Sequence, residues 1–596
     1  MKRKTIVILC MLLLALAALT ACGNGEVSIK TQPASVTVSY PEGATFSVDV
    51  KNAKNVESYQ WYAVDQAGNE FELVGVTAKT ASLVVPATDC MGADIDFYCV
   101  IKDKAGNEIT SETATLSVDN TEESKPVFYV GEYAVEPGET LDLATVDLGD
   151  GTKLGSGTVA FDANGTDITL TDVDFDNTLI SCDFALAPNV GLCLQQDRPD
   201  AEEINVTFVG ENRIVNNYYD EDYNAGGIPF DFYFLGDEEK PVVNLIGDGT
   251  LEITNGSIAL RSLSDMMVDV DVTIKQTRQI YGDGIIAENL MIGEGRKLDL
   301  EVFGSALMAN GNLFISGAEI NIKAGAPHVS MGITTKNVIQ GDITLNVENS
   351  KITIESQADP EICAGIAGYT GLSAGGEMFL TNSDISYTVN ALPKEEVYAS
   401  NFIGLSAASI DVDGTRLAIN ADTEDIFNMY GLYADQYVVF ENSEATFDIK
   451  TSGPVYGIAP EGDFSSDNSK VTVNVANYDK FAEYGGTANY GIMCGSFVMK
   501  ADEPDQLVTV KTAEGMAVGC NLEDTKEEKA AYQEGYEASH FVMRDDSAIQ
   551  TPEDDVISTG SVEQGDESYR YYIWVETVYS KADTSKPAAE VVFGNE

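Results

Sequence analysis

Apolar residues occupy every second position in many short stretches of the chain. In GDGTLEITNGSIALRS (247–262), Leu251 and Ile253 alternate with Glu252 and Thr254 before an Asn-Gly turn. Such alternation places successive side chains on opposite faces of a β-strand. Similar stretches recur at NLFISGAEINIKAG (312–325), LNVENSKITIES (345–356), FLTNSDISYTVNA (379–391), VVFENSEATFDIKTSG (438–453) and FSSDNSKVTVNVAN (464–477). The repetition predicts stacked strands rather than one hairpin.

The repeated stretches follow one another with a nearly regular period. Aligned on the first apolar residue after the turn, they step by 32, 33, 32, 28 and 26 residues, at Ile320, Ile352, Ile385, Leu417, Ala445 and Val471. A second element begins with Gly-(Ile/Leu), at GIIA (284–287), GITT (332–335), GIAG (365–368), GLSA (404–407), GLYA (431–434) and GIAP (457–460). Such self-similarity marks a solenoid. Because strands dominate, we expect a parallel β-helix whose turn Asn and Gly residues adopt positive φ.

Residues 27–119 have a different rhythm of short strands and turns, typical of a β-sandwich. The expected strands are ATFSVDVKN (44–52), SYQWYAVD (58–65), ASLVVPA (81–87), DFYCVIKDKAG (96–106) and ETATLSVD (112–119). The segment resembles bacterial immunoglobulin-like domains, with Trp61 and Cys99 at the core positions. Val48 stands where that family has the second cysteine, so the usual disulfide is missing. The resemblance implies a spacer, and 120–126 (NTEESKP) reads as the linker that follows it.

Residues 127–520 carry a second resemblance. LGSGTVAFDANGTDITLTDVDFDN (154–177) looks like the opening of clostridial-type carbohydrate-binding β-helix proteins, and 204–217 and 242–260 look like the next two coils. The resemblance implies an all-β chain in which the immunoglobulin-like sandwich is followed by a long right-handed parallel β-helix of the pectin-lyase type. It also implies binding of plant polysaccharide without established catalysis. The same coils serve lyases, hydrolases and adhesins, so these alternatives stay open.

The first residues resemble a lipoprotein signal. MKRKTIVILCMLLLALAALTAC has a basic start, an apolar run too short for a stable span, and a Leu-Thr-Ala-Cys ending. We expect removal of residues 1–21, lipidation of Cys22 and a short tether over 22–26. This predicts an extracytoplasmic protein held to the membrane only by its lipid. Plain secretion, with Cys22 incidental, is the alternative.

Charge and composition narrow the classes of partner. The net charge is −61, and loss of Lys2, Arg3 and Lys4 with the signal makes it −64. A field of that sign repels nucleic acid and anionic membranes. The chain has only two histidines, His328 and His540, and this scarcity argues against a Ser-His-Asp triad or a His-rich metal site. The cysteines after Cys22 show neither zinc spacing nor a disulfide framework. We expect a monomer that needs no cofactor.

Aromatic and acidic residues gather in NNYYDEDYNAGGIPFDFYFLGD (216–237). Aromatic rings stack on sugar faces and carboxylates bond sugar hydroxyls. We therefore predict a ligand face made of Tyr218, Tyr219, Tyr223, Phe232 and Phe234. The acids of the same stretch could instead hold Ca²⁺, a hard cation that prefers oxygen ligands, through Asp220, Asp222 and Asp231. A third interpretation is that FDFYF is a strand of core aromatics and the Tyr-Asp run a solvated loop.

The last segment, 521–596, is expected to form a β-rich cap. NLEDTKEEKAAYQEGYEA (521–538) is a short helix candidate and YRYYIWVETVY (569–579) a strand. Together they would cover the open end of the β-helix, which otherwise exposes an unpaired edge. The whole pattern predicts a cell-surface protein that binds a polysaccharide or another surface glycan through its β-helix.

Overall fold

The protein was analysed as a computed structural model. It describes residues 27–39, 43–64, 70–73, 77–85, 94–119, 126–131, 133–148, 152–176, 182–184, 187–197, 201–220, 225–235, 240–276, 282–325, 334–358, 367–391, 400–422, 426–478, 489–500, 507–512, 515–520, 541–543, 549–550, 556–558, 562–563, 571–573, 578–580 and 590–594. The chain divides into two compact units. The first contains Met1–Val127, Gly131–Tyr133 and Leu179–Pro188, and the second contains Phe128–Val130, Ala134–Thr178 and Asn189–Glu596.

The first unit is built from short strands around an aromatic core. Its main sheet has the order β2-β10-β8-β5-β6, with β9 on β8, and two further pairs are β3–β7 and β1–β4. Trp61 of β5 and Cys99 of β8 are register partners, and both side chains are fully buried. Val48 is also buried. Strands occur in all five expected stretches, whereas the immunoglobulin-like assignment itself stays a prediction. The bounds are β1 Ser28–Thr31, β2 Val36–Ser39, β3 Ala44–Ser47, β4 Asp49–Lys51, β5 Val56–Val64, β6 Glu70–Glu72, β7 Ser82–Val85, β8 Ile95–Asp103, β9 Glu108–Thr110 and β10 Ala114–Asp119, with 3₁₀ turns at Ala53–Asn55 and Thr77–Lys79.

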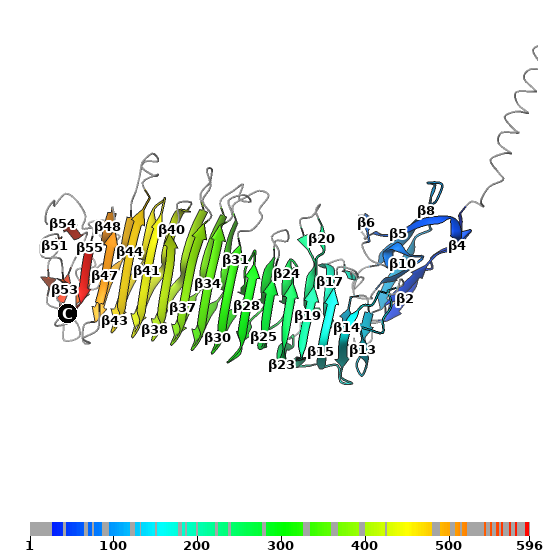
Figure 1. Cartoon of the computed structure of the whole chain (residues 1–596), viewed down its shortest axis with the longest axis horizontal. Coiled ribbons are helices and arrows are strands. Elements are labelled where there is room, and N and C mark those ends of the chain that lie inside the picture. Colours follow the sequence, from blue (N-terminus) through cyan, green and yellow to red (C-terminus); the bar gives the residue numbers. More distant parts are fainter. Residues whose placement is uncertain are drawn as a thin grey trace, which may run out of the picture. The chain divides into compact units, whose positions relative to one another are not determined.

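The second unit is a parallel β-helix of stacked coils (Figure 1). The pairings between strands of successive coils divide it into three sheets, here called I, II and III. Sheet I contains β17 Ala187–Asp197, β22 Ile228–Leu235, β24 Ile258–Ser262, β26 Asp283–Ala287, β29 Leu307–Ala309, β32 Thr334–Gly341, β35 Ala367–Ala374, the first parts of β38 Ser400–Asp413 and β40 Ile426–Glu441, β42 Val455–Pro460, β45 Asn489–Cys494 and β48 Gly515–Cys520. Neighbouring strands of each sheet are parallel and one coil apart, which confirms the solenoid predicted from the period.

Sheets II and III follow sheet I in each coil. Sheet II contains the first parts of β15 Asp167–Asp176, β23 Val242–Thr254 and β25 Met266–Lys275, then β18 Glu203–Val209, β27 Leu290–Ile292, β30 Asn312–Ser316, β33 Thr344–Glu348, β36 Glu377–Thr381, the second parts of β38 and β40, β43 Asp463–Asp467, β46 Ser496–Lys500 and β49 Phe541–Met543. Sheet III contains the second parts of β15, β23 and β25, then β19 Glu211–Val215, β28 Lys297–Val302, β31 Glu319–Gly325, β34 Lys351–Ala358, β37 Asp384–Ala391, β39 Arg416–Asp422, β41 Glu444–Thr451, β44 Lys470–Asn477 and β47 Leu507–Thr512.

The register of sheet III matches the alignment of the sequence repeats. The six residues that define the period stack directly on one another in the order Ile320, Ile352, Ile385, Leu417, Ala445 and Val471. All of them are buried. A single coil has no second layer to cover its inward side chains, so stacking neighbours completes the core. The repeated alternation therefore builds one continuous apolar interior.

The turn between sheets II and III has the backbone conformation predicted for its asparagines. Asn349, Asn382, Asn442 and Asn468 have φ of 51°, 47°, 50° and 45°. Asn tolerates this left-handed region better than other residues with a Cβ. The next residue of each turn forms a second ladder, because the hydroxyl oxygen of each coil accepts a hydrogen bond from the backbone N–H of the coil before it. These bonds measure 3.0–3.1 Å and join Ser350, Ser383, Thr415, Ser443 and Ser469.

The second sequence element was assigned correctly in some coils and wrongly in two. Ile285, Leu405, Leu432 and Ile458 belong to one stack on sheet I, as expected. Between Ile285 and Leu405 the stack continues through Leu307, Ile339 and Leu372, not through residues of GITT (332–335) or GIAG (365–368). The GLSA at 371–374 is the true repeat of the GLSA at 404–407, since Leu372 pairs with Leu405. Two similar tetrapeptides a few residues apart made the sequence alignment ambiguous.

The ends of the β-helix are covered by antiparallel strands. At the start, β13 Thr140–Asp142 and β14 Gly155–Phe161 lead antiparallel into β15, so 154–177 forms a hairpin rather than a full parallel coil. At the other end, β55 Glu590–Gly594 pairs antiparallel with β47, and β53 Tyr571–Ile573 with β49. These two strands thus pair with edges that the β-helix would otherwise expose, whereas the cap expected over 521–596 stays a prediction. The helix candidate 521–538 lies outside the described residues.

The remaining strands are short. They are β11 Val127–Val130, β12 Tyr133–Val135, β16 Cys182–Phe184, β20 Tyr219–Asp220, β21 Ala225–Gly226, β50 Ile549–Gln550, β51 Val556–Ser558, β52 Val562–Glu563 and β54 Val578–Ser580. Among the helices that the structure describes, none has the length and hydropathy needed to cross a membrane. The expected signal and Cys22 lie outside the described residues.

Candidate functional site

Three tyrosines from consecutive coils form a ladder on the outer face of sheet I. Tyr430, Tyr456 and Tyr490 come from β40, β42 and β45 and are in register. Tyr430 and Tyr456 have ring centroids 4.6 Å apart and planes 9° apart, and Tyr456 and Tyr490 have centroids 5.1 Å apart and planes 13° apart. All three are partly exposed. The spacing is that of neighbouring strands, so each ring continues the stack by one coil.

A glycine after each tyrosine allows the coils to approach this closely. A Cβ on Gly431 would lie 2.4 Å from the carbonyl oxygen of Gly457 and 2.7 Å from Phe447 Cδ1. A Cβ on Gly457 would lie 2.5 Å from the carbonyl oxygen of Gly491. The residue after the glycine, such as Leu432, is also buried, so strict alternation is interrupted here. Tyr430 and Tyr433, three residues apart, are therefore both partly exposed.

Tyr433 packs against the ladder on the same strand as Tyr430 and forms a hydrogen bond with Glu461. Its ring centroid lies 5.7 Å from that of Tyr430 with the planes at 72°, an edge-to-face contact. Its hydroxyl donates a hydrogen bond of 2.8 Å to Glu461 Oε1. Burial and that bond to Glu461 raise the pKa of Tyr433 above its usual value. Burial, followed by the neighbouring Tyr430 and Tyr490, also raises the pKa of Tyr456. These phenols are therefore neutral at physiological pH.

The tyrosine face combines rigid apolar rings with hydroxyl groups and carries no positive charge. Strands β40, β42 and β45 contain neither Lys nor Arg, and Asp435 and Glu461 lie beside the rings. Tyrosine provides a large amphipathic contact surface at low cost in conformational entropy, and stacked rings are already held in place. Ring edges and hydroxyls spaced by one coil suit a neutral, hydroxyl-rich chain that lies along the β-helix.

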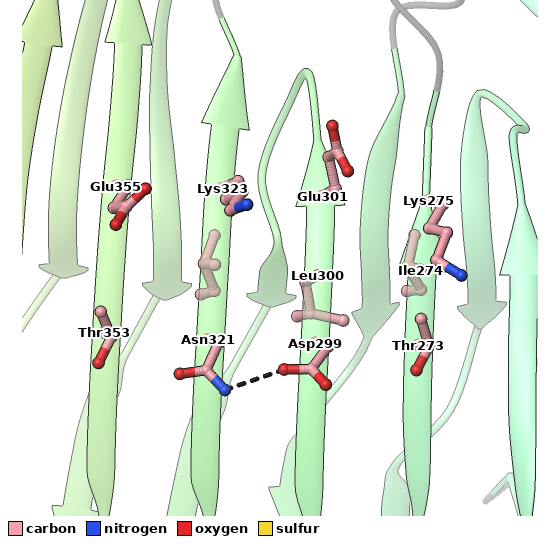
Figure 2. A pocket seen from close by; sticks show the side chains of 11 residues that line it. Thr273, Ile274, Lys275, Asp299, Leu300, Glu301, Asn321, Lys323, Thr353 and Glu355 are labelled. Carbon is pink, nitrogen blue, oxygen red and sulfur yellow. Dashed lines mark hydrogen bonds between the residues drawn. The ribbon is translucent and has the colours of Figure 1, made fainter.

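A groove of about 360 Å³ crosses the outer face of sheet III and is lined by polar side chains together with Ile274, Leu300 and Ile322 (Figure 2). It runs over β25, β28, β31 and β34, between two rows of outward side chains. One row is Thr273, Asp299, Asn321 and Thr353, and the other is Lys275, Glu301, Lys323 and Glu355. Asn321 Nδ2 donates a hydrogen bond of 2.9 Å to Asp299 Oδ1. The groove can offer donors and acceptors to a polar ligand.

The predicted aromatic ligand face is corrected by the structure at two of its residues. Phe232 and Phe234 lie in β22, where their side chains are 0% and 2% exposed. Phe232 packs on Phe230 with ring centroids 4.8 Å apart. The FDFYF stretch is therefore a strand of core aromatics, the third of the interpretations left open by the sequence. Rings buried inside the β-helix have no face free for stacking on a sugar.

Asp231 is engaged by an arginine rather than placed for a metal. It is 1% exposed, and Arg261 donates to both of its oxygens, from Nε at 2.9 Å and from Nη2 at 2.6 Å. Burial raises the pKa of Asp231, and the Arg261 guanidinium counteracts that rise. Among the described residues, no group of three or more His, Cys, Asp or Glu side chains could hold a metal ion. The expectation of a calcium ligand at Asp231 is therefore wrong for this arrangement.

The other residues of the predicted site remain untested. Tyr218 is partly exposed, and its backbone N–H donates to Asn216 Oδ1 at 3.0 Å. The backbones of Tyr219 and Asp220 form β20, whereas their side chains are outside the described set. Asp222 and Tyr223 lie outside the described residues altogether. Calcium binding and sugar contact at these positions stay predictions.

The tyrosine ladder corresponds to a short motif in the sequence. The motif Tyr-Gly-(Ile/Leu) occurs at 430–432, 456–458 and 490–492. Two of these copies overlap the Gly-(Ile/Leu) elements of the repeat, and the residue before the glycine was not compared. A partly exposed aromatic at the same position of successive coils is visible from the register, but the sequence shows it only once the correct coils are aligned.

Comparisons with known proteins add little to the site. No family model and no curated protein sequence matches the chain. Among solved structures, pectate lyase Pel3 from Pectobacterium carotovorum aligns with 68% of this chain and 86% of its own, at 10% identity and a TM-score of 0.12. That similarity is too low to support an argument about binding or catalysis. The parallel β-helix rests on the strand register of the chain itself.

Proposed function

We propose that this chain is a surface protein that binds a linear polysaccharide along sheet I of its β-helix, through the tyrosine ladder. The observation that carries the proposal is the stack of Tyr430, Tyr456 and Tyr490, partly exposed on adjacent coils. A stack without ligand leaves ring edges and hydroxyls in water. A hydroxyl-rich polymer would contact several coils at once, and weak contacts repeated along a polymer add up through effective concentration.

The charge of the face favours a neutral or amino-bearing polymer over a polyuronate. Asp435 and Glu461 border the tyrosines, and the three strands of the ladder have no cation to pair with a carboxylate. The net charge of −61 also disfavours binding of an anionic polymer. Like charges across an interface reduce affinity, so an anionic polymer would need bridging metal ions.

The placement of the protein is the second part of the proposal. The Leu-Thr-Ala-Cys ending at Cys22 supports lipid anchoring, and the first unit would act as a spacer between anchor and β-helix. A spacer of that kind would hold the binding face away from the membrane. The alternative placement is secretion without an anchor.

The experiment mixes the full chain with a panel of insoluble and soluble polysaccharides and measures both retention and products. Retention without new reducing ends or unsaturated products supports a binding protein. Product formation would instead support a lyase or hydrolase on the same fold. A chain that neither binds nor cleaves any member of the panel would favour an adhesin for a protein partner or a structural role, and would contradict the proposal.

A further inference from the structure

Charged residues alternate in sign along the outer face of sheet III. In the row that lines the groove, Lys275, Glu301, Lys323 and Glu355 are successive register partners. A second row, four residues earlier on each strand of the same face, alternates over more coils, in the order Lys297, Glu319, Lys351, Asp384, Arg416, Glu444 and Lys470. A chain with a net charge of −61 thus places six of its 35 basic residues in these two rows.

Neighbouring opposite charges have a structural benefit, because like charges on adjacent strands would repel. That benefit explains the second row, whose members are exposed and in part paired, as in the 3.8 Å contact between Arg416 and Glu444 on adjacent strands. It does not explain the open groove beside the first row. Among the described residues, Glu301, Lys323 and Glu355 take part in no ion pair or side-chain hydrogen bond, whereas Lys275 contacts Glu252 at 3.0 Å.

Three of the four charged groups in the groove row, Glu301, Lys323 and Glu355, are therefore available to a ligand, and Lys275 would share its ammonium group with Glu252. Figure 2 shows the Lys275, Glu301, Lys323 and Glu355 row beside the Thr273, Asp299, Asn321 and Thr353 row, on four neighbouring strands. Strands are about 4.8 Å apart, so the sign changes at that interval and each sign recurs after roughly 9.6 Å. The hydroxyls and the amide of the other row supply neutral hydrogen-bond donors and acceptors.

We propose that this groove binds a linear glycan that carries ammonium and carboxylate groups in alternation. Lys275 and Lys323 would pair with its carboxylates, and Glu301 and Glu355 with its ammonium groups. Thr273, Asn321 and Thr353 would bond hydroxyls of the sugar rings. A uniform polyanion meets Glu301 and Glu355, and a uniform polycation meets Lys275 and Lys323, so like-charge contacts select against both. This site is on sheet III and does not depend on the tyrosine ladder of sheet I.

The test measures binding of the full chain to four probes by titration calorimetry. Oligomers of carboxymethyl chitosan carry both charges, chitosan oligomers only ammonium groups, oligogalacturonate only carboxylates, and cello-oligosaccharides neither. The proposal expects the tightest binding for carboxymethyl chitosan, with an affinity that falls as salt is raised. Because the tyrosine ladder also favours amino-bearing polymers, the titration is repeated on the full chain with Tyr430→Ala, Tyr456→Ala and Tyr490→Ala. Equal or tighter binding of chitosan to that variant would mean that net charge alone attracts the ligand, and would overturn the proposal. A peptide of alternating Lys and Glu that binds more tightly than the glycan would overturn it as well.

Substitutions then locate the site. Lys323→Glu should weaken carboxymethyl chitosan binding roughly fivefold or more, and the milder Lys323→Gln should weaken it without adding a repulsive charge. The matched control is Lys351→Glu, the same change in the second row, which should leave the affinity within roughly twofold. Inverting all four charges of the groove row restores the alternation and should restore binding. Equal losses at Lys323 and Lys351, or no loss at Lys323, would contradict the proposal. Melting temperatures of each variant exclude unfolding as the cause.

Discussion

Tyr430 and Tyr456 stack with their ring planes 9° apart and their centroids 4.6 Å apart, although 26 positions separate them in the sequence. The contact exists because the β-helix places the same position of successive coils one strand spacing apart. Any side chain repeated at that position becomes a continuous surface feature. In this chain the repeated side chain is a partly exposed tyrosine, and the proposed binding face follows from it.

The glycines behind the tyrosines should be essential to the stack. Gly431→Ala places a Cβ 2.4 Å from a backbone oxygen of the next coil, so either the coils separate or the local strand shifts. We expect a loss of about 1–3 kcal/mol in the free energy of unfolding, the usual cost of overpacking, together with weaker polysaccharide retention. Urea denaturation measures the first effect.

Gly295→Ala is the matched control for that substitution. Gly295 has φ of 76° but no atom within 4 Å of the added Cβ, so only the backbone cost of roughly 1–2 kcal/mol applies. Polysaccharide retention should then be unchanged. If Gly431→Ala binds and unfolds like the wild type, the close approach of the coils is not needed for the ladder.

The buried pair of Asp231 and Arg261 should be sensitive to loss of one partner. Arg261→Ala leaves an unpaired carboxylate that is 1% exposed, and we expect a destabilisation of roughly 3–5 kcal/mol. Removing both charges, with Asp231→Leu and Arg261→Met, should recover most of that loss, because the apolar pair has no charge to desolvate. Thermal unfolding of the three proteins checks the expectation. A double variant no more stable than Arg261→Ala would show that the ion pair itself is required.

Asp283 should make stability depend on pH. Burial raises the pKa of Asp283 to about 6, although the hydrogen bond that its carboxylate accepts from the Ser305 N–H partly opposes the rise. The folded state therefore holds the proton of Asp283 more tightly than the unfolded chain does. The stability that this proton contributes is complete below the unfolded pKa of about 4 and is lost as the pH rises to about 6. Asp283→Asn should remove this dependence and stabilise the protein at neutral pH.

The difference in unfolding free energy between wild type and Asp283→Asn, measured from pH 4 to pH 7, isolates this one group from the other acids. A stabilisation that increases with pH over that interval, by up to roughly 2 kcal/mol, agrees with the account. A difference that is constant with pH would show that the carboxyl is ionised normally in the folded state.

Cys22 should decide where the protein is found. If it carries the lipid, Cys22→Ala should release the protein from the membrane fraction into the medium or block its processing. Fractionation followed by immunoblotting measures the distribution. A Cys22→Ala variant that stays in the membrane fraction would contradict the anchoring proposal, without bearing on the tyrosine ladder.

The sequence predicted the architecture well because periodicity is a direct consequence of the coil geometry. Ile320 and Ile352 were aligned from their turns, and they are register partners in sheet III. The Asn turns were predicted for the same reason, since few residues tolerate positive φ. The alignment failed at GITT and GIAG because the insertions between sheets III and I vary in length. Near GIAG a similar tetrapeptide, GLSA, also begins six residues later.

The candidate site was much harder to predict. Phe232 was selected because aromatic and acidic residues are dense around it, but density along the chain does not distinguish a buried strand from an exposed loop. Tyr430 was missed because the ring that it stacks on, Tyr456, lies 26 positions away in the sequence, and the next ring of the ladder lies another 34 positions further. A site assembled across coils becomes visible only when the register is known. The alternating charges of sheet III were hidden for the same reason.

The most direct test of the central claim compares three proteins on the polysaccharide that the wild type retains best. The variant Tyr430→Ala, Tyr456→Ala and Tyr490→Ala removes the ladder, and Tyr218→Ala, Tyr219→Ala and Tyr223→Ala removes the other predicted aromatic group. Affinity electrophoresis gives the dissociation constant of each, and circular dichroism confirms that each remains β-structured. The account predicts a loss of roughly tenfold or more for the ladder variant, on the order of 0.5–1.5 kcal/mol per ring, and a smaller loss for the other. A folded ladder variant that binds like the wild type would contradict the account.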